Sequence, residues 1–132
     1  MNVFVNGTFD VLHLGHLSLL NHSKSLGDKL FVGLDSDRRV SEKKGLSRPI
    51  NNVYERQQIL LNLKAVDEVM IFDSDEELTM LVKQIRPGIM VVGSDWKGKP
   101  IIGSEFAKQL FYYSRIDGYS STQKIQDIID RR

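Results

Sequence analysis

The residues with the clearest chemical potential are two histidines close to the start of the chain. His13 and His16 are three positions apart, so on a helix both imidazoles can lie on one face. Gly15 between them lets a ligand approach the backbone closely, and Gly7 lets the chain turn sharply before the helix. The first turn of a helix adds unpaired N–H groups and positive potential. Together these features favour a phosphate-binding pocket.

Two other interpretations of the histidine pair are open at this point. The two residues can be ordinary surface histidines, or they can belong to a zinc site with Asp10 or His22 as a further ligand. The chain has no cysteine, which excludes thiolate ligands, and no third ligand stands out. The sequence contains neither G-x-G-x-x-G nor a Walker A motif. We therefore expect no metal site made by the protein, and phosphate binding through a different motif.

Hydroxyl groups near the other end of the chain form a second candidate site. Ser120, Ser121 and Thr122 lie at the start of a predicted helix, where hydroxyls and amides can hold phosphate. One of the two serines can serve as the N-cap at the same time, because the two roles are compatible.

A polar segment between the two candidate sites carries further basic residues. Residues 35–51 are charged and contain glycine and proline, so we predict a mobile loop. Lys43 and Lys44 in this loop are either solvated or bind phosphate when the loop closes over a substrate. Arg48 and Arg56 are candidate clamps for anionic groups, and Arg56 is the stronger of the two.

These candidates need a scaffold that brings distant segments together, and the hydrophobic pattern predicts one. Short β-branched runs alternate with helical periods, which is typical of a parallel sheet with helices on both faces. The predicted strands are 2–5, 29–34, 68–72, 89–92 and 110–113, and the predicted helices are 14–26, 53–63, 76–85 and 121–129. We expect an α/β fold over residues 1–132, a Rossmann-like three-layer α/β/α domain with a five-stranded parallel sheet.

The periodicity also predicts which helix residues face the core and where a ligand binds. The residues expected to face inward are Leu14, Leu17 and Leu20 of the first helix and Ile125, Ile128 and Ile129 of the last. Ligands of such sheets bind beyond the carboxyl ends of the strands, where the strand order reverses.

Composition limits the class of partner. With 18 basic and 17 acidic residues the net charge is +1, so no overall field favours nucleic acid or an anionic membrane. The absence of cysteine fits a reducing compartment, no apolar stretch reaches membrane-spanning length, and the short apolar run at 3–5 does not open a signal peptide. We expect a cytoplasmic protein that has no nucleic-acid or membrane partner.

Three motifs resemble those of one enzyme family. Residues 7–16 have the pattern G-T-F-D-x-x-H-x-G-H and resemble the signature of the cytidylyltransferase-like nucleotidyltransferases. Residues 115–122 (R-I-D-G-Y-S-S-T) resemble the R-T-E/D-G-x-S-T-T/S segment of that family, and residues 93–96 (G-S-D-W) resemble the G-D-D-W stretch of glycerol-3-phosphate cytidylyltransferases. Two motifs at opposite ends of so short a chain are highly specific in combination.

The resemblance implies a reaction and roles for individual residues. An acceptor phosphate would attack the α-phosphorus of a nucleoside triphosphate, and pyrophosphate would leave without a covalent enzyme intermediate. The implied catalytic residues are His13, His16, Lys43, Lys44 and Arg115; the implied nucleotide-binding residues are Gly7, Thr8, Phe9, Gly15, Asp95, Arg115, Gly118, Ser120, Ser121 and Thr122; and the implied acceptor-binding residues are Asp10, Arg56 and Trp96. Asp10 would either orient the motif or bind near the acceptor. The family also implies Mg²⁺ carried by the triphosphate and a homodimer.

The sequence gives conflicting indications of the two substrates. Arg115 together with the 93–96 motif favours CTP and a glycerol-3-phosphate-type acceptor. Residues 44–51 and 102–105 instead resemble the adenylyltransferase that makes ADP-heptose, and archaeal FAD synthetases, which act on FMN, share the first motif. Tyr119 and Ser121 depart from the usual I/V and T of the second motif, which weakens its indication of the base. We place CTP ahead of ATP, with a non-catalytic nucleotide-binding regulator and a metal-dependent hydrolase as alternatives of other classes.

Overall fold

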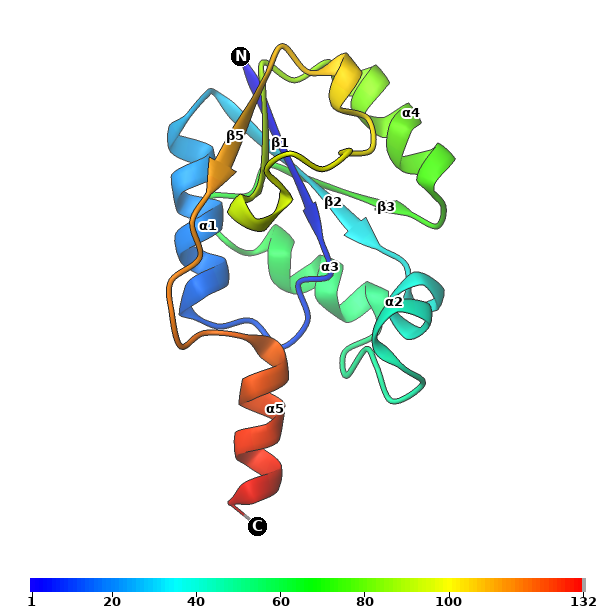
Figure 1. Ribbon diagram of the computed structural model, residues 1–132, viewed down its shortest axis with the longest axis vertical. Coiled ribbons are helices and arrows are strands. Elements are labelled where there is room, and N and C mark those ends of the chain that lie inside the picture. The colour runs from blue at the N-terminus through cyan, green and yellow to red at the C-terminus, as the bar shows by residue number, and fades with distance from the viewer. Residues whose placement is uncertain (132) are drawn as a thin grey trace.

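The strands run in parallel through the middle of the molecule, with helices on both sides (Figure 1). The computed structural model describes residues 1–131, and within them one sheet has the order β3-β2-β1-β4-β5. The strands are β1 (Asn2–Gly7), β2 (Lys29–Asp35), β3 (Glu68–Phe72), β4 (Ile89–Gly93) and β5 (Gln109–Tyr113). The helices are α1 (Leu14–Ser25), α2 (Asp37–Lys44), α3 (Val53–Leu61), α4 (Asp75–Ile85) and α5 (Ser121–Asp130), with 3-10 turns at Ser94–Trp96 and Ser104–Phe106. The predicted fold class is confirmed.

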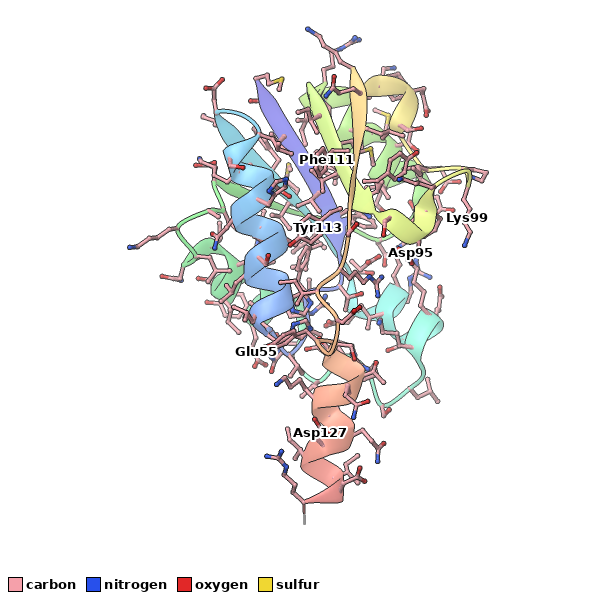
Figure 2. The ribbon with its side chains drawn as sticks, turned by 60° about the vertical axis from the view of Figure 1, so that its left-hand side comes forward. Glu55, Asp95, Lys99, Phe111, Tyr113 and Asp127 are labelled. Carbon is pink, nitrogen blue, oxygen red and sulfur yellow. The ribbon has the colours of Figure 1, made fainter. Side chains whose placement is uncertain are left out.

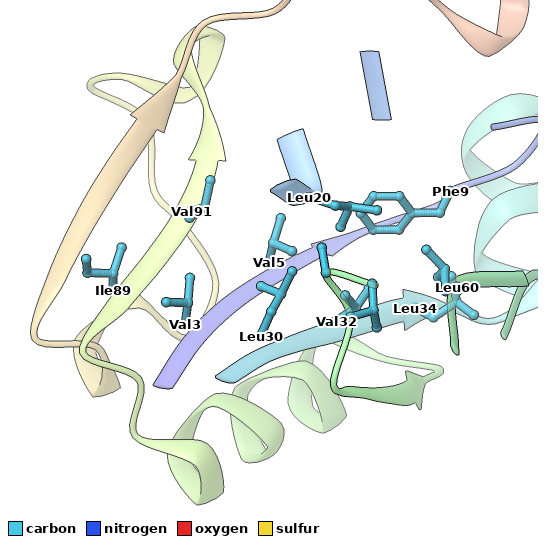
Figure 3. Close-up of a cluster of buried hydrophobic side chains, with 12 residues drawn as sticks. Val3, Val5, Phe9, Leu20, Leu30, Val32, Leu34, Leu60, Ile89 and Val91 are labelled. Carbon is cyan, nitrogen blue, oxygen red and sulfur yellow. The ribbon is translucent and has the colours of Figure 1, made fainter. Parts of the chain in front are cut away.

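Alternation along the strands produces two cores, one on each face of the sheet. Val3 and Val5 of β1 point into the core formed with α1 and α3, where Leu20 and Leu60 are buried (Figure 3). Phe4, between them in the sequence, points into the opposite core with α4. Complete burial of a side chain of this size contributes roughly 1.5–3 kcal/mol. The two cores fix β1 firmly at the centre of the sheet.

The strand order reverses beside β1, and this determines where a ligand can bind. From β1 the chain passes through α1 to β2 on one side, whereas β4 pairs with β1 on the other side. The segments that follow β1, β4 and β5 therefore leave the same edge of the sheet (Figure 1). This edge is the one that the sequence predicted for the site.

The prediction of a mobile loop over residues 35–51 is wrong in its first half. Residues 37–44 form α2, and Ser36 caps this helix by accepting a hydrogen bond from the Arg39 amide. Arg39 is buried and donates to Asp35 at 2.9 Å, so the charged helix is anchored by an ion pair. Its almost wholly polar sequence concealed the helix, because Val40 is its one apolar residue and the ion pair of Arg39 leaves no hydrophobic pattern.

Several residues expected to face inward are exposed. In α1, Leu20 is buried, but Leu14 and Leu17 are 53% and 37% exposed. In α5, Ile128 and Ile129 are 65% and 47% exposed. For the residues of α5 the reason is visible in Figure 1, where this helix extends away from the sheet and places no face against it.

The helices of the described residues are all short. No helix within residues 1–131 is long and apolar enough to cross a bilayer.

Candidate active site

The carboxyl ends of β1, β4 and β5 open into a cavity of about 450 Å³. The predicted residues that line it are Gly7, Thr8, Phe9, Asp10, His13, Gly15, His16, Lys43, Lys44, Trp96, Arg115, Ser120, Ser121 and Thr122. Asp95, Gly118 and Arg56 are not among the lining residues. The structure thus brings residues of the motifs at 7–16 and 115–122, together with Lys43 and Lys44, to one cavity, although these segments are far apart in the sequence.

The two histidines are oriented by hydrogen bonds from the backbone. The Gly15 amide donates to His13 Nδ1 at 3.0 Å, and the His13 amide donates to His16 Nδ1 at 3.2 Å. Because each Nδ1 accepts a hydrogen bond, a neutral ring must carry its own proton on Nε2. Each imidazole therefore offers one N–H donor beyond the helix start, where α1 adds its positive end.

The electrostatic surroundings keep His16 neutral. Burial is the main cause that lowers the pKa of His16 to about 4, and His13, Lys44 and Arg115 lower it further. Burial and Lys124 also lower the pKa of His13. A bound polyphosphate would oppose these effects, because its negative charge favours the protonated imidazole.

The backbone just before α1 is strained. Phe9 and Val11 have φ values of 50° and 51°, in the left-handed region that a β-branched residue rarely adopts. Such residues cost of order 1–3 kcal/mol each and persist only where surrounding contacts enforce them. The strain lies within the motif itself, on both sides of Asp10.

Asp10 supplies the contacts that hold this segment in place. Its carboxylate is buried and accepts from the amides of Ile50 and Asn51 at 2.7 and 2.9 Å. Its carbonyl oxygen accepts a hydrogen bond from the Ser121 hydroxyl. Asp10 therefore joins three segments of the cavity wall, and its carboxylate oxygens are already engaged within the protein.

Arg56 does not reach the cavity, so the structure does not support the expectation that it binds the acceptor. Its side chain is fully buried and donates to the carbonyl oxygens of Thr8 and Asp35 at 2.9 Å and of Asn51 at 3.0 Å. A fourth bond at 2.8 Å goes to the Asp37 carboxylate. Sequence alone could not separate a buried arginine that organises loops from one that faces a ligand.

The structure distinguishes the two candidate lysines. Lys43 Nζ lies 3.5 Å from the Asp35 carboxylate and forms an ion pair with it. Within residues 1–131 no carboxylate lies within ion-pair distance of Lys44, whose pKa is lowered by burial and by the nearby cations Arg48 and Arg115. Lys44 is thus the lysine whose charge is free for an anionic ligand.

The opposite wall of the cavity is more open. Arg115 is 72% exposed, and one of its nitrogens lies 3.6 Å from the exposed carboxylate of Asp95. Trp96 lines the cavity but is 48% exposed. Figure 2 shows Asp95 and Tyr113 at the middle height of the molecule, above the helix that carries Asp127. The side chains of Arg115, Asp95 and Trp96 are accessible to a ligand without any rearrangement of the core.

Sequence reasoning missed the contribution of Tyr119, which it treated only as a departure from the motif. The Tyr119 ring stacks on His13, with ring centroids 5.9 Å apart. A Cβ atom at position 15 would lie 2.8 Å from His13 Cε1 and 3.1 Å from Tyr119 Cβ, so only glycine fits there. Gly15 is the sequence signal that could have indicated this contact, because the space left by its missing side chain is occupied by His13 and Tyr119.

The charge balance of the cavity favours an anion. Its lining contains four cationic side chains, Lys43, Lys44, Arg48 and Arg115, and two carboxylates, which are those of Asp10 and Asp35. Both carboxylates are already bonded within the protein. Among the described residues no group of three or more His, Cys, Asp or Glu side chains is arranged to hold a metal ion. Fold and cavity together define an α/β protein with a parallel sheet whose carboxyl edge carries a cavity that favours an anion.

Comparison with known proteins identifies the family. The chain belongs to the cytidylyltransferase-like family, whose model matches residues 4–126. The bifunctional protein HldE of Campylobacter fetus is 47% identical over 126 residues, which cover 96% of this chain and 27% of the relative. HldE of Sulfurimonas denitrificans is also 47% identical, over 96% of this chain and 26% of the relative. The chain therefore spans about a quarter of the length of these curated relatives.

Two solved structures share the fold of this chain. The lipopolysaccharide core biosynthesis protein of Thermoplasma volcanium superposes with a TM-score of 0.68 at 27% identity, covering 91% of this chain and 98% of that one. A protein of Archaeoglobus fulgidus, 22% identical with a TM-score of 0.59, has the same fold over 74% of this chain. The expected nucleotidyltransferase family and enzyme class are confirmed.

Proposed function

We propose that residues 1–132 form a nucleotidyltransferase domain that transfers AMP from ATP to a sugar 1-phosphate of the heptose type. The observation that carries this proposal is the 47% identity to HldE proteins over 96% of the chain. It agrees with the resemblance of residues 44–51 and 102–105 to the adenylyltransferase that makes ADP-heptose. These relatives favour ATP and a sugar phosphate over CTP and glycerol 3-phosphate, which the sequence alone had placed first.

The solved relative from Thermoplasma supports the same class of acceptor. It is described as a lipopolysaccharide core biosynthesis protein. A core saccharide is assembled from sugars that have first been activated, and joining a nucleotide to a sugar 1-phosphate is one way to activate them. A sugar 1-phosphate also carries the phosphate oxygen that such a transfer requires as its nucleophile.

The proposed reaction needs no nucleophilic side chain. An oxygen of the sugar phosphate attacks the α-phosphorus of ATP, the bond from that phosphorus to the bridging oxygen breaks, and pyrophosphate leaves with the electron pair. The protein contributes position and charge neutralisation. The Nε2–H groups of His13 and His16 donate to phosphate oxygens as charge develops, and Lys44 neutralises the polyphosphate.

Mg²⁺ belongs to the same proposal and would arrive with ATP. The cavity carboxylates, Asp10 and Asp35, are bonded to backbone amides and to basic side chains respectively. This arrangement fits an ion held by phosphate oxygens and water rather than by a cage of protein ligands. In that position the ion neutralises charge on the triphosphate. A homodimer is also proposed, and sedimentation of the purified chain tests it.

A pyrophosphate-release assay tests the proposed function. ATP, CTP, GTP and UTP are each combined with a heptose 1-phosphate, glycerol 3-phosphate or FMN in the presence of Mg²⁺. We expect turnover with ATP and the heptose 1-phosphate, and loss of that turnover in His16→Asn. Preference for CTP with glycerol 3-phosphate would contradict the proposal. Nucleotide binding without turnover would indicate a regulator, and metal-dependent hydrolysis without nucleotide would indicate a hydrolase.

A further inference from the structure

Arg48 differs from the other buried arginines of the described residues. Arg39 donates to two carboxylates, and Arg56 donates to three carbonyl oxygens and a carboxylate. Arg48 is 9% exposed, yet its Nε and Nη2 atoms are buried and have no hydrogen-bond partner within residues 1–131. Of these three arginines, Arg48 is also the one that lines the cavity. Buried donor nitrogens without hydrogen-bond partners are costly, so their retention here needs a reason.

The remaining contacts of Arg48 are long. The Asp10 carboxylate forms an ion pair with Arg48, 3.6 Å from Nε, but this is beyond hydrogen-bond distance, and the carboxylate accepts from two backbone amides. The hydroxyl of Thr122, at the start of α5, lies 3.5 Å from Nη1. The nearby charged side chain of Lys44 is also cationic. The protein therefore leaves most of the hydrogen-bonding capacity of this guanidinium unused.

The backbone holds Arg48 in this position. The Ser41 hydroxyl donates to the Arg48 carbonyl at 2.6 Å, and the Arg48 amide donates to the Gly45 carbonyl at 3.1 Å. The amides of Ile50 and Asn51 are held by Asp10. Because the chain is fixed on both sides, the side chain does not simply swing into solvent. A fixed cation beside a cavity loses little freedom when it binds an anion.

We propose that Arg48, together with Thr122, forms a subsite that binds one phosphate group of the substrates. The guanidinium would donate from the nitrogens that have no partner, and the Thr122 hydroxyl and the first turn of α5 would bind the same group. The proposal rests on the proposed function for the nature of its ligands. The phosphate belongs either to ATP, and then to the pyrophosphate that leaves, or to the sugar phosphate.

Binding measurements without turnover test the subsite. Arg48→Met keeps a long side chain and removes every donor, and Arg38→Met removes an exposed arginine of the nearby helix α2 as a matched control. Calorimetry measures the affinities of ATP, inorganic pyrophosphate and a heptose 1-phosphate. Thermal unfolding of the ligand-free protein reports on folding.

We expect Arg48→Met to weaken at least one of these ligands by about 10- to 100-fold, which corresponds to loss of a charged hydrogen bond. Its unfolding temperature without ligand should stay close to that of the unmodified protein, because loss of the ion pair with Asp10 is offset by removal of two buried nitrogens that have no hydrogen-bond partner. Weaker binding of ATP and pyrophosphate assigns the subsite to the nucleotide, and weaker binding of the sugar phosphate alone assigns it to the acceptor. Arg38→Met should bind every ligand normally.

Unchanged affinity of Arg48→Met for all three ligands would overturn the subsite. A lower unfolding temperature with unchanged affinities would show a structural role instead. If Arg48→Met does not fold, Arg48→Lys decides, since lysine keeps the charge but cannot form the planar two-point contact. Equal affinity in that variant overturns the proposal. Failure of adenylyl transfer would contradict the proposed function while leaving the pyrophosphate measurement intact.

Discussion

The two walls of the cavity are built in different ways. The first wall, residues 7–16 with residues 43–51, is held by the buried side chains of Asp10 and Arg56. The second wall, residues 113–122, carries exposed side chains, including Arg115, and reaches the first wall through the Ser121 hydroxyl. One wall is fixed by many buried hydrogen bonds, and the other is attached by few.

This difference suits the two walls to different roles in the proposed reaction. The first wall holds the histidines in one tautomer and in one position, as transfer at phosphorus requires. Arg115 of the second wall and the neighbouring Trp96 can adapt to a base or a sugar, because their side chains are exposed. We therefore expect substitutions in the first wall to affect folding and rate, and substitutions in the second to affect affinity and specificity.

Arg56→Met is expected to cause the largest loss of stability, because Arg56 holds the first wall together. It would leave three carbonyl oxygens and the Asp37 carboxylate without their donor. Removal of one partner from a buried charged network costs roughly 3–5 kcal/mol in the free energy of unfolding. Urea denaturation measures this loss. A change below about 1 kcal/mol would show that the first wall does not depend on Arg56.

His16→Asn is expected to have the next largest effect, on rate rather than on folding. Loss of one donor to developing charge lowers kcat by roughly 100- to 1000-fold. Pyrophosphate release measures the rate, and His22→Asn is the matched control, since His22 lies on the same helix outside the cavity. Turnover of His16→Asn close to that of the unmodified protein would remove the histidine from the mechanism.

The motif at residues 115–122 was easier to find in the sequence than the buried contacts that hold the first wall. Strand and helix positions followed from hydrophobic alternation, and the rule for parallel sheets placed the site at the right edge. Helix α2 and the structural role of Arg56 did not follow, because buried polar contacts leave no periodic pattern, whereas orientation of the motif by Asp10 was one of the two roles that the resemblance implied. Exposure of Ile128 was also missed, since an amphipathic pattern does not say whether a partner layer exists.

The pH dependence of stability should report on His16 in the first wall. Its pKa is about 4 in the folded protein and about 6.5 when unperturbed, so the unfolded chain takes up a proton first as the pH falls. This residue therefore lowers the free energy of unfolding progressively as pH falls from about 6.5 towards 4, and contributes no change above that range. Urea denaturation at several pH values measures this, and His16→Asn should flatten the dependence in this window. An identical slope in both proteins would contradict the low pKa.

Ser121→Ala should loosen the connection between the walls with a smaller effect. The hydroxyl donates to the carbonyl oxygens of Asp10 and Val11. Loss of such a neutral bond costs about 1 kcal/mol. We expect a modest fall in the unfolding temperature and a higher KM for ATP, with kcat nearly unchanged. Ser120→Ala, which removes the N-cap of α5, is the comparison, since it weakens the helix start without breaking the contact between walls.

Ile128→Glu is expected to have the smallest effect on folding. Ile128 is 65% exposed on a helix that extends away from the sheet, and a substitution at such a surface usually changes the free energy of unfolding by less than about 0.5 kcal/mol. Leu20→Ala in the core should cost about 2–5 kcal/mol by contrast. Urea denaturation at several protein concentrations decides the matter. A large loss that depends on concentration would mean that a second copy covers α5, and that the second wall is fixed only in the proposed dimer.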